Sequence, residues 1–111
     1  MKPFMFVIVA VPSKDNRHYQ NIFKAIVHIW VMDDNIESAK QKALTDIKNS
    51  HWIPQNIEHE FEMTGVQPDT LHEAEAALYQ RALTYGIASD YIVSPVYEKP
   101  KDSPVVIDDV Y

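Results

Sequence analysis

Residues 22–63 constrain the fold more than any other part of the chain, because their apolar pattern changes period twice. An extended run (IFKAIVHIWVM, residues 22–32) precedes a stretch with apolar residues three or four positions apart (residues 34–49), and a strictly alternating run follows (residues 56–63). Apolar residues repeat every second position in a strand and about every 3.6 positions in a helix. The pattern therefore predicts a strand–helix–strand crossover, whose two strands run parallel.

The first predicted helix has one narrow apolar face. Asp34 and Glu37 have the spacing of a capping box at its start, and Pro54 prevents its simple continuation beyond residues 49–51. The apolar residues on its single stripe are Ile36, Ala39, Ala43, Leu44 and Ile47. A helix of this kind lies with one side on a sheet and the other side in water.

Residues 4–11 (FMFVIVAV) are apolar at every position, which is typical of a central strand covered on both faces. Pro12 ends this strand, and the polar residues 13–21 form a long hairpin loop. The run is short for a signal-peptide core, has no clear small-residue cleavage site after it, and is far too short to span a bilayer. The sequence therefore favours a buried strand in a cytoplasmic protein without a membrane segment.

The order of the predicted strands follows from their connections. The hairpin makes the first two strands antiparallel, whereas the crossover makes the second and third parallel, so residues 4–11 lie between the others in the order 2-1-3. We expect an α+β two-layer sandwich, ββαβα, with both helices on one face and a fourth strand as an option at residues 90–97, which Pro95 interrupts. Its layers resemble those of the ferredoxin-like folds, but the element order of that group, βαββαβ, differs, so no functional residues carry over.

Each outer strand of this predicted sheet has two distinct faces. In residues 22–32, an apolar row should face the helices: Phe23, Ala25, Val27, Ile29 and Val31. A mixed row points the other way: Ile22, Lys24, Ile26, His28, Trp30 and Met32. In residues 56–63, Ile57, His59, Phe61 and Met63 form one row, and the opposite row of Asn56, Glu58, Glu60 and Glu62 should share the face of Trp30. Charges in that position are typical of an edge strand.

The second predicted helix begins near residues 68–70, where Thr70 and Glu73 again have capping-box spacing, and Gly86 ends it. Its main apolar stripe comprises Leu71, Ala74, Leu78, Ala82 and Tyr85. A second stripe lies roughly a third of a turn away, given about 100° per residue, and comprises His72, Ala76, Tyr79 and Leu83. A helix that is apolar on two sides is buried on two sides, so we expect it to contact more than its own sheet.

The length of 111 residues indicates one domain, residues 1–97, followed by an extended arm, residues 98–111. Proline residues at positions 100 and 104 favour an extended chain, and the arm ends with apolar residues 105–107 beside Asp108 and Asp109. Docking of this arm on the body or on a second subunit, and a free tail, are equal alternatives.

Composition excludes several kinds of chemistry. The chain has no cysteine, and its two glycines cannot build a phosphate-binding loop. The formal net charge of −6 argues against direct binding of nucleic acid, which requires clustered Lys and Arg. The run HEAEA at residues 72–76 lacks the second histidine of a zinc-binding helix. We therefore expect no cofactor and no metal, and the sequence leans against an enzyme without excluding one.

The mixed strand row and the second helical stripe define the candidate interface or pocket residues: Ile26, His28, Trp30, His72, Tyr79 and Leu83. An apolar sheet face is rarely left in water, so the first hypothesis is a non-enzymatic interaction or regulatory protein that acts as a homodimer, with Trp30 at the subunit contact and a further protein as a partner. The alternative is a small-molecule binder or enzyme with a pocket near His28, Trp30 and Tyr79. A second alternative is an acidic inhibitor of a nucleic-acid-binding protein, which would use Glu58, Glu60, Glu62, Asp108 and Asp109.

Overall fold

A computed structural model describes residues 1–96 of the chain, so the arm predicted at residues 98–111 lies outside the described residues. The elements are β1 (Lys2–Pro12), β2 (Ile22–Asp33), α1 (Ile36–Asn49), β3 (Trp52–Glu62), the short 3₁₀ turn η1 (Pro68–Thr70), α2 (Glu73–Tyr85) and β4 (Ile87–Pro95). Among residues 1–96, no helix combines the length and the apolar character needed to cross a membrane.

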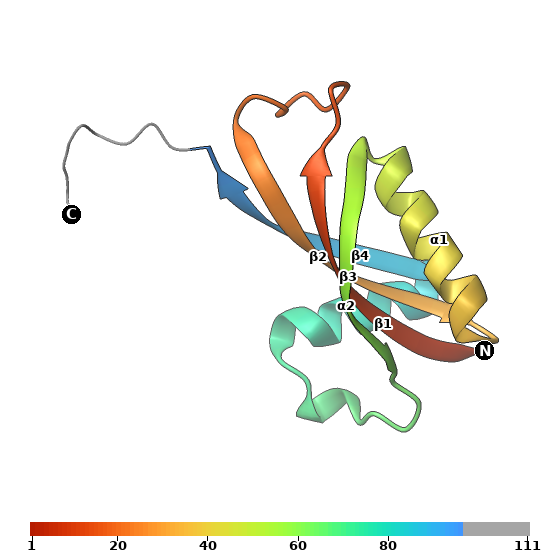
Figure 1. Ribbon diagram of the computed structural model, residues 1–111. Coiled ribbons are helices and arrows are strands. Elements are labelled where there is room, and N and C mark those ends of the chain that lie inside the picture. Colours follow the sequence, from red (N-terminus) through yellow and green to blue (C-terminus); the bar gives the residue numbers. More distant parts are fainter. Residues whose placement is uncertain (97–111) are drawn as a thin grey trace.

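The four strands form one sheet in the order β3-β1-β2-β4, in which every neighbouring pair is antiparallel (Figure 1). β1 lies between β2 and β3, which are therefore parallel to each other. The α+β class and the predicted order 2-1-3 are confirmed. The option of a fourth strand is also realised, and β4 pairs with β2, so the prediction that β2 is an edge strand is wrong.

The main core lies between the sheet and α1. Phe6, Ile8, Val27 and Ile29 project from the two central strands against α1, whose buried residues are Ala39, Ala43 and Ile47. Asn35 caps α1 by accepting a hydrogen bond from the backbone N–H of Ser38 at 2.8 Å, so the cap lies one residue after the predicted Asp34. A cap of this kind contributes about 1 kcal/mol.

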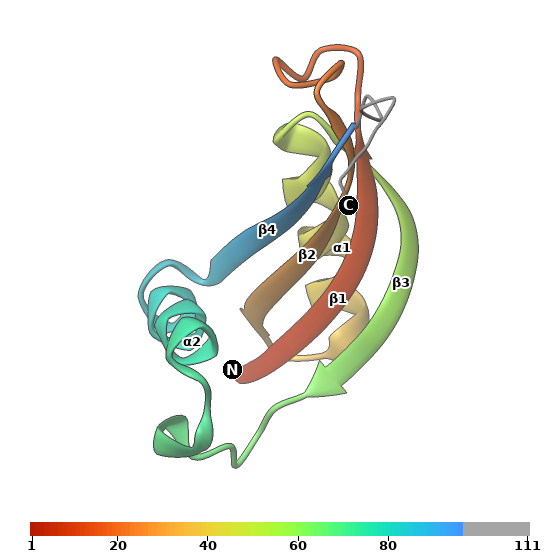
Figure 2. The same cartoon turned by 90° about the vertical axis from the view of Figure 1, so that its left-hand side faces the viewer.

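α2 packs on the opposite face of the sheet, at one end, so the prediction that both helices share one face is wrong (Figure 2). Its buried residues Leu78 and Ala82 cluster with Trp30 of β2 and Ala88 of β4. The connections at both ends of α2 agree with this face. Met63, just after β3, already packs in this cluster, and Gly86 (φ 86°) turns the chain directly from α2 into β4.

Only one side of α2 is buried, although the sequence predicts two. Tyr79 and Leu78, from different predicted stripes, both lie in the contact with the sheet, whereas His72 is exposed and the side chain of Leu83 is 48% exposed. The predicted capping box at Thr70 does not form either, because α2 begins at Glu73 after His72. Thr70 instead donates its hydroxyl to the carbonyl of Gln67, the residue before η1. Gly86 ends the helix in the left-handed conformation, as predicted.

Register shifts change which face several strand residues occupy. Between its pairing with Val7 and with Ile8, β3 shifts register, so Ile57 packs toward α1 while His59 and Phe61 lie on the opposite face. Glu60 lies on the α1 side, with a carboxylate oxygen 3.3 Å from the Lys40 Nζ. The prediction that Glu60 and Glu62 share the face of Trp30 is therefore wrong.

A second shift, in β2, reverses the prediction for its first residues. Between Ile22 and Lys24 the pairing of β2 with β4 is irregular. As a result Ile22 packs against the α1 core, and Phe23, which was expected to face the helices, is 63% exposed.

Asp33 links the end of β2 to α1 and makes stability depend on pH. Ser38, the backbone N–H of Asp34 and Lys42, whose Nζ lies 3.0 Å from the carboxylate, hold the pKa of Asp33 below its ordinary value of 3.8. A lowered folded-state pKa stabilises the protein above the unfolded value, and this stabilisation is lost as the pH falls through the folded value.

Asp33→Asn should therefore lower the free energy of unfolding at neutral pH, and the difference from the wild type should shrink as the pH falls from about 7 to about 2.5. Urea unfolding at several pH values measures this difference. Asp34→Asn, which changes an exposed neighbour, is the control. A difference that stays constant over the whole pH range would contradict this role of Asp33.

Candidate functional site

The sheet face opposite to α1, here called the outer face, consists of transverse rows of cross-strand neighbours, each running from β4 through β2 and β1 to β3. The row under α2 is Ala88, Trp30, Met5 and Phe61. The second row is Asp90, His28, Val7 and His59, and the third is Ile92, Ile26, Val9 and Asn56. The outer face therefore has an apolar row at one end, then a row with titratable side chains, and then a mainly apolar row. α2 lies over the first of these ends (Figure 2).

Glu75 of α2 joins the first two rows. One of its carboxylate oxygens accepts the indole N–H of Trp30 at 2.8 Å, and the other lies 3.1 Å from Nδ1 of His28. A carboxylate only accepts hydrogen bonds, so Nδ1 of His28 is the donor in this contact. Tyr79, one turn after Glu75, places its ring 5.3 Å from that of Trp30. We call these four residues the Glu75 cluster.

The structure brings three of the six predicted site residues together: His28, Trp30 and Tyr79. Ile26 lies in the third row, His72 is exposed just before α2, and Leu83 is about half exposed on α2. Sequence reasoning missed Glu75. The available signal was its position four residues before Tyr79, which places both on the same face of a helix.

Trp30 is fully buried, with 0% exposure, by α2 of its own chain. The prediction that Trp30 forms the contact with a second subunit is therefore wrong. The physical reason is that the indole needed both an apolar cover and an acceptor for its N–H, and α2 supplies the two together.

His28 has half of the arrangement that acid–base catalysis needs, a histidine oriented by a carboxylate. The surface formed by residues 1–96 has hollows that measure from about 290 to about 480 Å³, and none of these is lined by His28, Trp30 or Tyr79.

His59 shares the row and the face of His28, which the sequence did not predict. The strand β1 separates them by two strand spacings, roughly 10 Å. Residues 1–96 contain no group of three potential ligands that could hold a metal ion.

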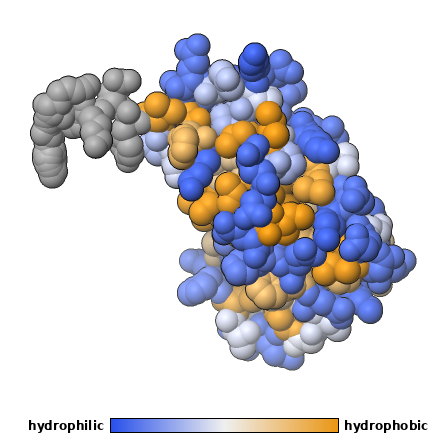
Figure 3. Space-filling view, viewed as in Figure 1, coloured by the Kyte–Doolittle hydropathy of each residue, from blue (hydrophilic) through white to orange (hydrophobic). Residues whose placement is uncertain are grey.

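A mainly apolar hollow of about 480 Å³ lies at the hairpin end of the sheet. Its lining includes Tyr19, Phe23, Ile53 and Val96. In Figure 3, hydrophobic side chains gather in this upper part of the molecule, beside the last described residues of β4. Because Val11 and Ile53 pair across β1 and β3, the hollow continues the apolar third row of the outer face.

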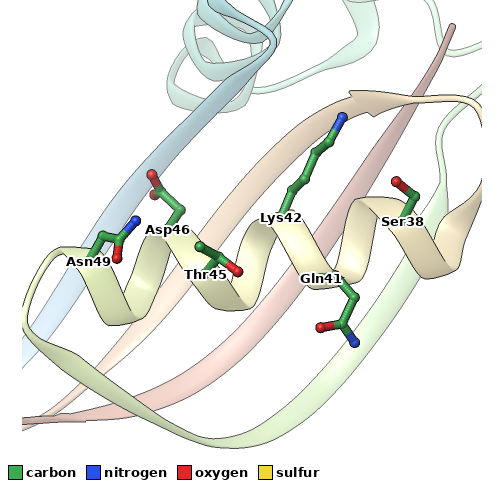
Figure 4. A pocket seen from close by; sticks show the side chains of 6 residues that line it. All are labelled: Ser38, Gln41, Lys42, Thr45, Asp46 and Asn49. Atoms are coloured by element: carbon green, nitrogen blue, oxygen red, sulfur yellow. The ribbon is translucent and has the colours of Figure 1, made fainter.

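A polar hollow of about 330 Å³ runs along the solvent side of α1 (Figure 4). Its side chains all project from this one helix and fan apart: Ser38, Gln41, Lys42, Thr45, Asp46 and Asn49. Lys42 is already paired with Asp33, and burial raises the pKa of the Asp46 carboxyl. The hollow therefore offers no convergent set of groups for a ligand.

Comparisons with protein-family models, with curated proteins and with solved structures each found no match.

The Glu75 cluster predicts a stability effect that identifies its role. Glu75→Ala leaves the buried indole N–H of Trp30 without an acceptor and should lower the free energy of unfolding by about 1–3 kcal/mol. Glu75→Gln retains an acceptor for this N–H and should cost less. Glu73→Ala is the matched control, because Glu73 lies in the same first turn of α2 but is exposed. Urea unfolding measures all three variants. Equal effects of Glu75→Ala and Glu73→Ala would contradict the role of Glu75.

Proposed function

We propose that this protein is a non-enzymatic interaction or regulatory protein that acts as a homodimer. The observation that carries the proposal is the apolar third row of the outer face beyond α2, which ends in Ile92 on β4. The side chain of Ile92 is 56% exposed, and the apolar hollow at the hairpin end extends the same surface. The row ends at Asn56 on β3, and exposed apolar surface of this kind marks a site of association in soluble proteins.

Charge supports a second copy as the occupant of this surface. Two copies of a chain with net charge −6 repel each other unless their contact surfaces carry few acidic groups. On the outer face, Asp90 is the acidic residue of the second row, and the third row has no charged residue. Glu60 and Glu62 pair with Phe6 and Phe4 and so lie on the α1 side, away from the proposed contact.

The alternative functions have less support. A small-molecule site near His28, Trp30 and Tyr79 needs a cavity, but the rings of Trp30 and Tyr79 pack directly on each other. An acidic inhibitor needs a continuous negative face, and Glu60 is paired with Lys40. Asp108 and Asp109, the other acids in that hypothesis, lie outside the described residues.

Sedimentation equilibrium of the full chain tests the proposal. We expect a dimer at concentrations up to roughly 100 µM, and Ile92→Glu should raise its dissociation constant by at least about tenfold, because it places a like charge on the apolar contact. Leu83→Glu is the matched control, since this leucine is also about half exposed but lies on α2. A wild-type chain that stays monomeric throughout would contradict the proposal, as would a dimer that only Leu83→Glu dissociates.

A further inference from the structure

The two edges of the sheet differ in how they are protected. β3 carries Glu58, Glu60 and Glu62 and two register shifts, both of which discourage pairing with another strand. β4 (IASDYIVSP) has one acidic residue, Asp90, and exposes apolar side chains on both faces, since Ile92 is 56% and Val93 45% exposed. β4 is therefore the edge that is suited to pair with a further strand.

The outward hydrogen-bonding groups of β4 follow from its register with β2. The backbone N–H of Met32 donates to the carbonyl of Gly86, and these residues continue the register in which Trp30 pairs with Ala88 and Ile26 with Ile92. Inward and outward groups alternate along an antiparallel ladder, so Ala88, Asp90, Ile92 and Ser94 direct their backbone groups toward β2. The backbone groups of Ser89, Tyr91 and Val93 therefore point outward. The Arg81 guanidinium donates to the carbonyl of Ser89 at 3.0 Å, which agrees with that direction.

We propose that two copies of this chain pair antiparallel along β4, with Ile92 of each copy opposite Ile92 of the other on a two-fold axis. This inference rests on the proposed homodimer and specifies its contact. In this register Tyr91 and Val93 of opposite copies exchange backbone hydrogen bonds. The carbonyl of Ser89, which is already occupied by Arg81, lies opposite Pro95, which has no N–H to donate.

Side chains favour the same register. Asp90 lies opposite Ser94 of the other copy, so the two aspartates do not face each other. The pair of Ile92 side chains extends the apolar third row of the outer face from one sheet into the other. On the opposite face, Val93 lies beside Tyr91 of the other copy, which itself packs against Trp52 in the α1 core. Registers centred nearer the start of β4 place Asp90 opposite Asp90 or Ile92 of the other copy. Registers centred nearer its end place Pro95 opposite residues whose backbone carbonyls would lack a donor, because proline has no N–H.

Cysteine cross-linking tests this register directly, because the chain has no cysteine of its own. Across the axis, Ile92→Cys would bring two Cα atoms to about 4.5 Å, the spacing of a non-hydrogen-bonded pair and within the range of a disulfide. Ser94→Cys is the matched control, since in this register two copies of residue 94 lie roughly 13 Å apart. Under mild oxidation we expect a covalent dimer from Ile92→Cys and a monomer on a non-reducing gel from Ser94→Cys.

A second variant separates edge pairing from stacking of outer faces. Val93→Pro removes an outward N–H and leaves the bonds of β4 to β2 intact, so it should raise the dimer dissociation constant by about tenfold or more. Glu62→Pro is its control, because Met63 donates to Pro3 and Glu62 therefore directs its N–H away from β1 on the other edge. Circular dichroism verifies that both variants are folded.

The outcomes distinguish the two proposals. A dimer that Val93→Pro dissociates and Ile92→Cys cross-links supports both. A dimer that is indifferent to Val93→Pro, or that Ser94→Cys cross-links as well as Ile92→Cys does, overturns the β4 register and leaves the homodimer standing. A wild-type chain that is monomeric overturns both.

Discussion

The buried indole N–H of Trp30 is the group on which the arrangement of this fold depends. Trp30 lies on a central strand, fully buried, and its polar atom requires an acceptor. Glu75 supplies that acceptor at 2.8 Å and contacts His28 with its other oxygen. His28 and Trp30, which lie on the same face of β2, therefore both contact the carboxylate of Glu75 on α2. These two contacts determine the face of the sheet on which α2 lies and its position along that face.

This placement divides the outer face into two parts. α2 covers the row of Trp30 together with Met5, and the mixed row of His28 lies at the border. Beyond the border are the third row, which ends in Ile92, and the hollow at the hairpin end. Exposed apolar surface therefore lies at the Ile92 end of the face and not at Trp30. We therefore propose a subunit contact at the edge strand β4, and not at Trp30 as the sequence suggested.

The sequence predicts strand order well because that order depends on chain connections and on average apolarity. Residues 4–11 are apolar on both faces and occupy the centre of the sheet, and the hairpin and crossover fix the rest. The sequence predicts poorly on which face of the sheet a helix packs. An apolar stripe indicates which side of α2 is buried, but it does not indicate which face of the sheet covers that side. Alternation also fails at register shifts: His59 and Phe61, beyond the shift in β3, and Phe23, next to the shift in β2, occupy the side opposite to that predicted. Glu75 was missed because an acidic residue in the first turn of a helix is usually explained by the helix dipole alone, although its spacing from Tyr79 places both on one face of the helix.

We propose that the part of the outer face beyond α2 belongs to a subunit contact that is made through the edge of β4. Amide hydrogen exchange followed by NMR at low and high protein concentration measures it most directly, one backbone N–H at a time. The account predicts that the amides of Tyr91 and Val93 become protected as the concentration rises, while the amide of Glu62 on the other edge exchanges rapidly at every concentration. Rapid exchange of Tyr91 and Val93 at all concentrations would contradict it.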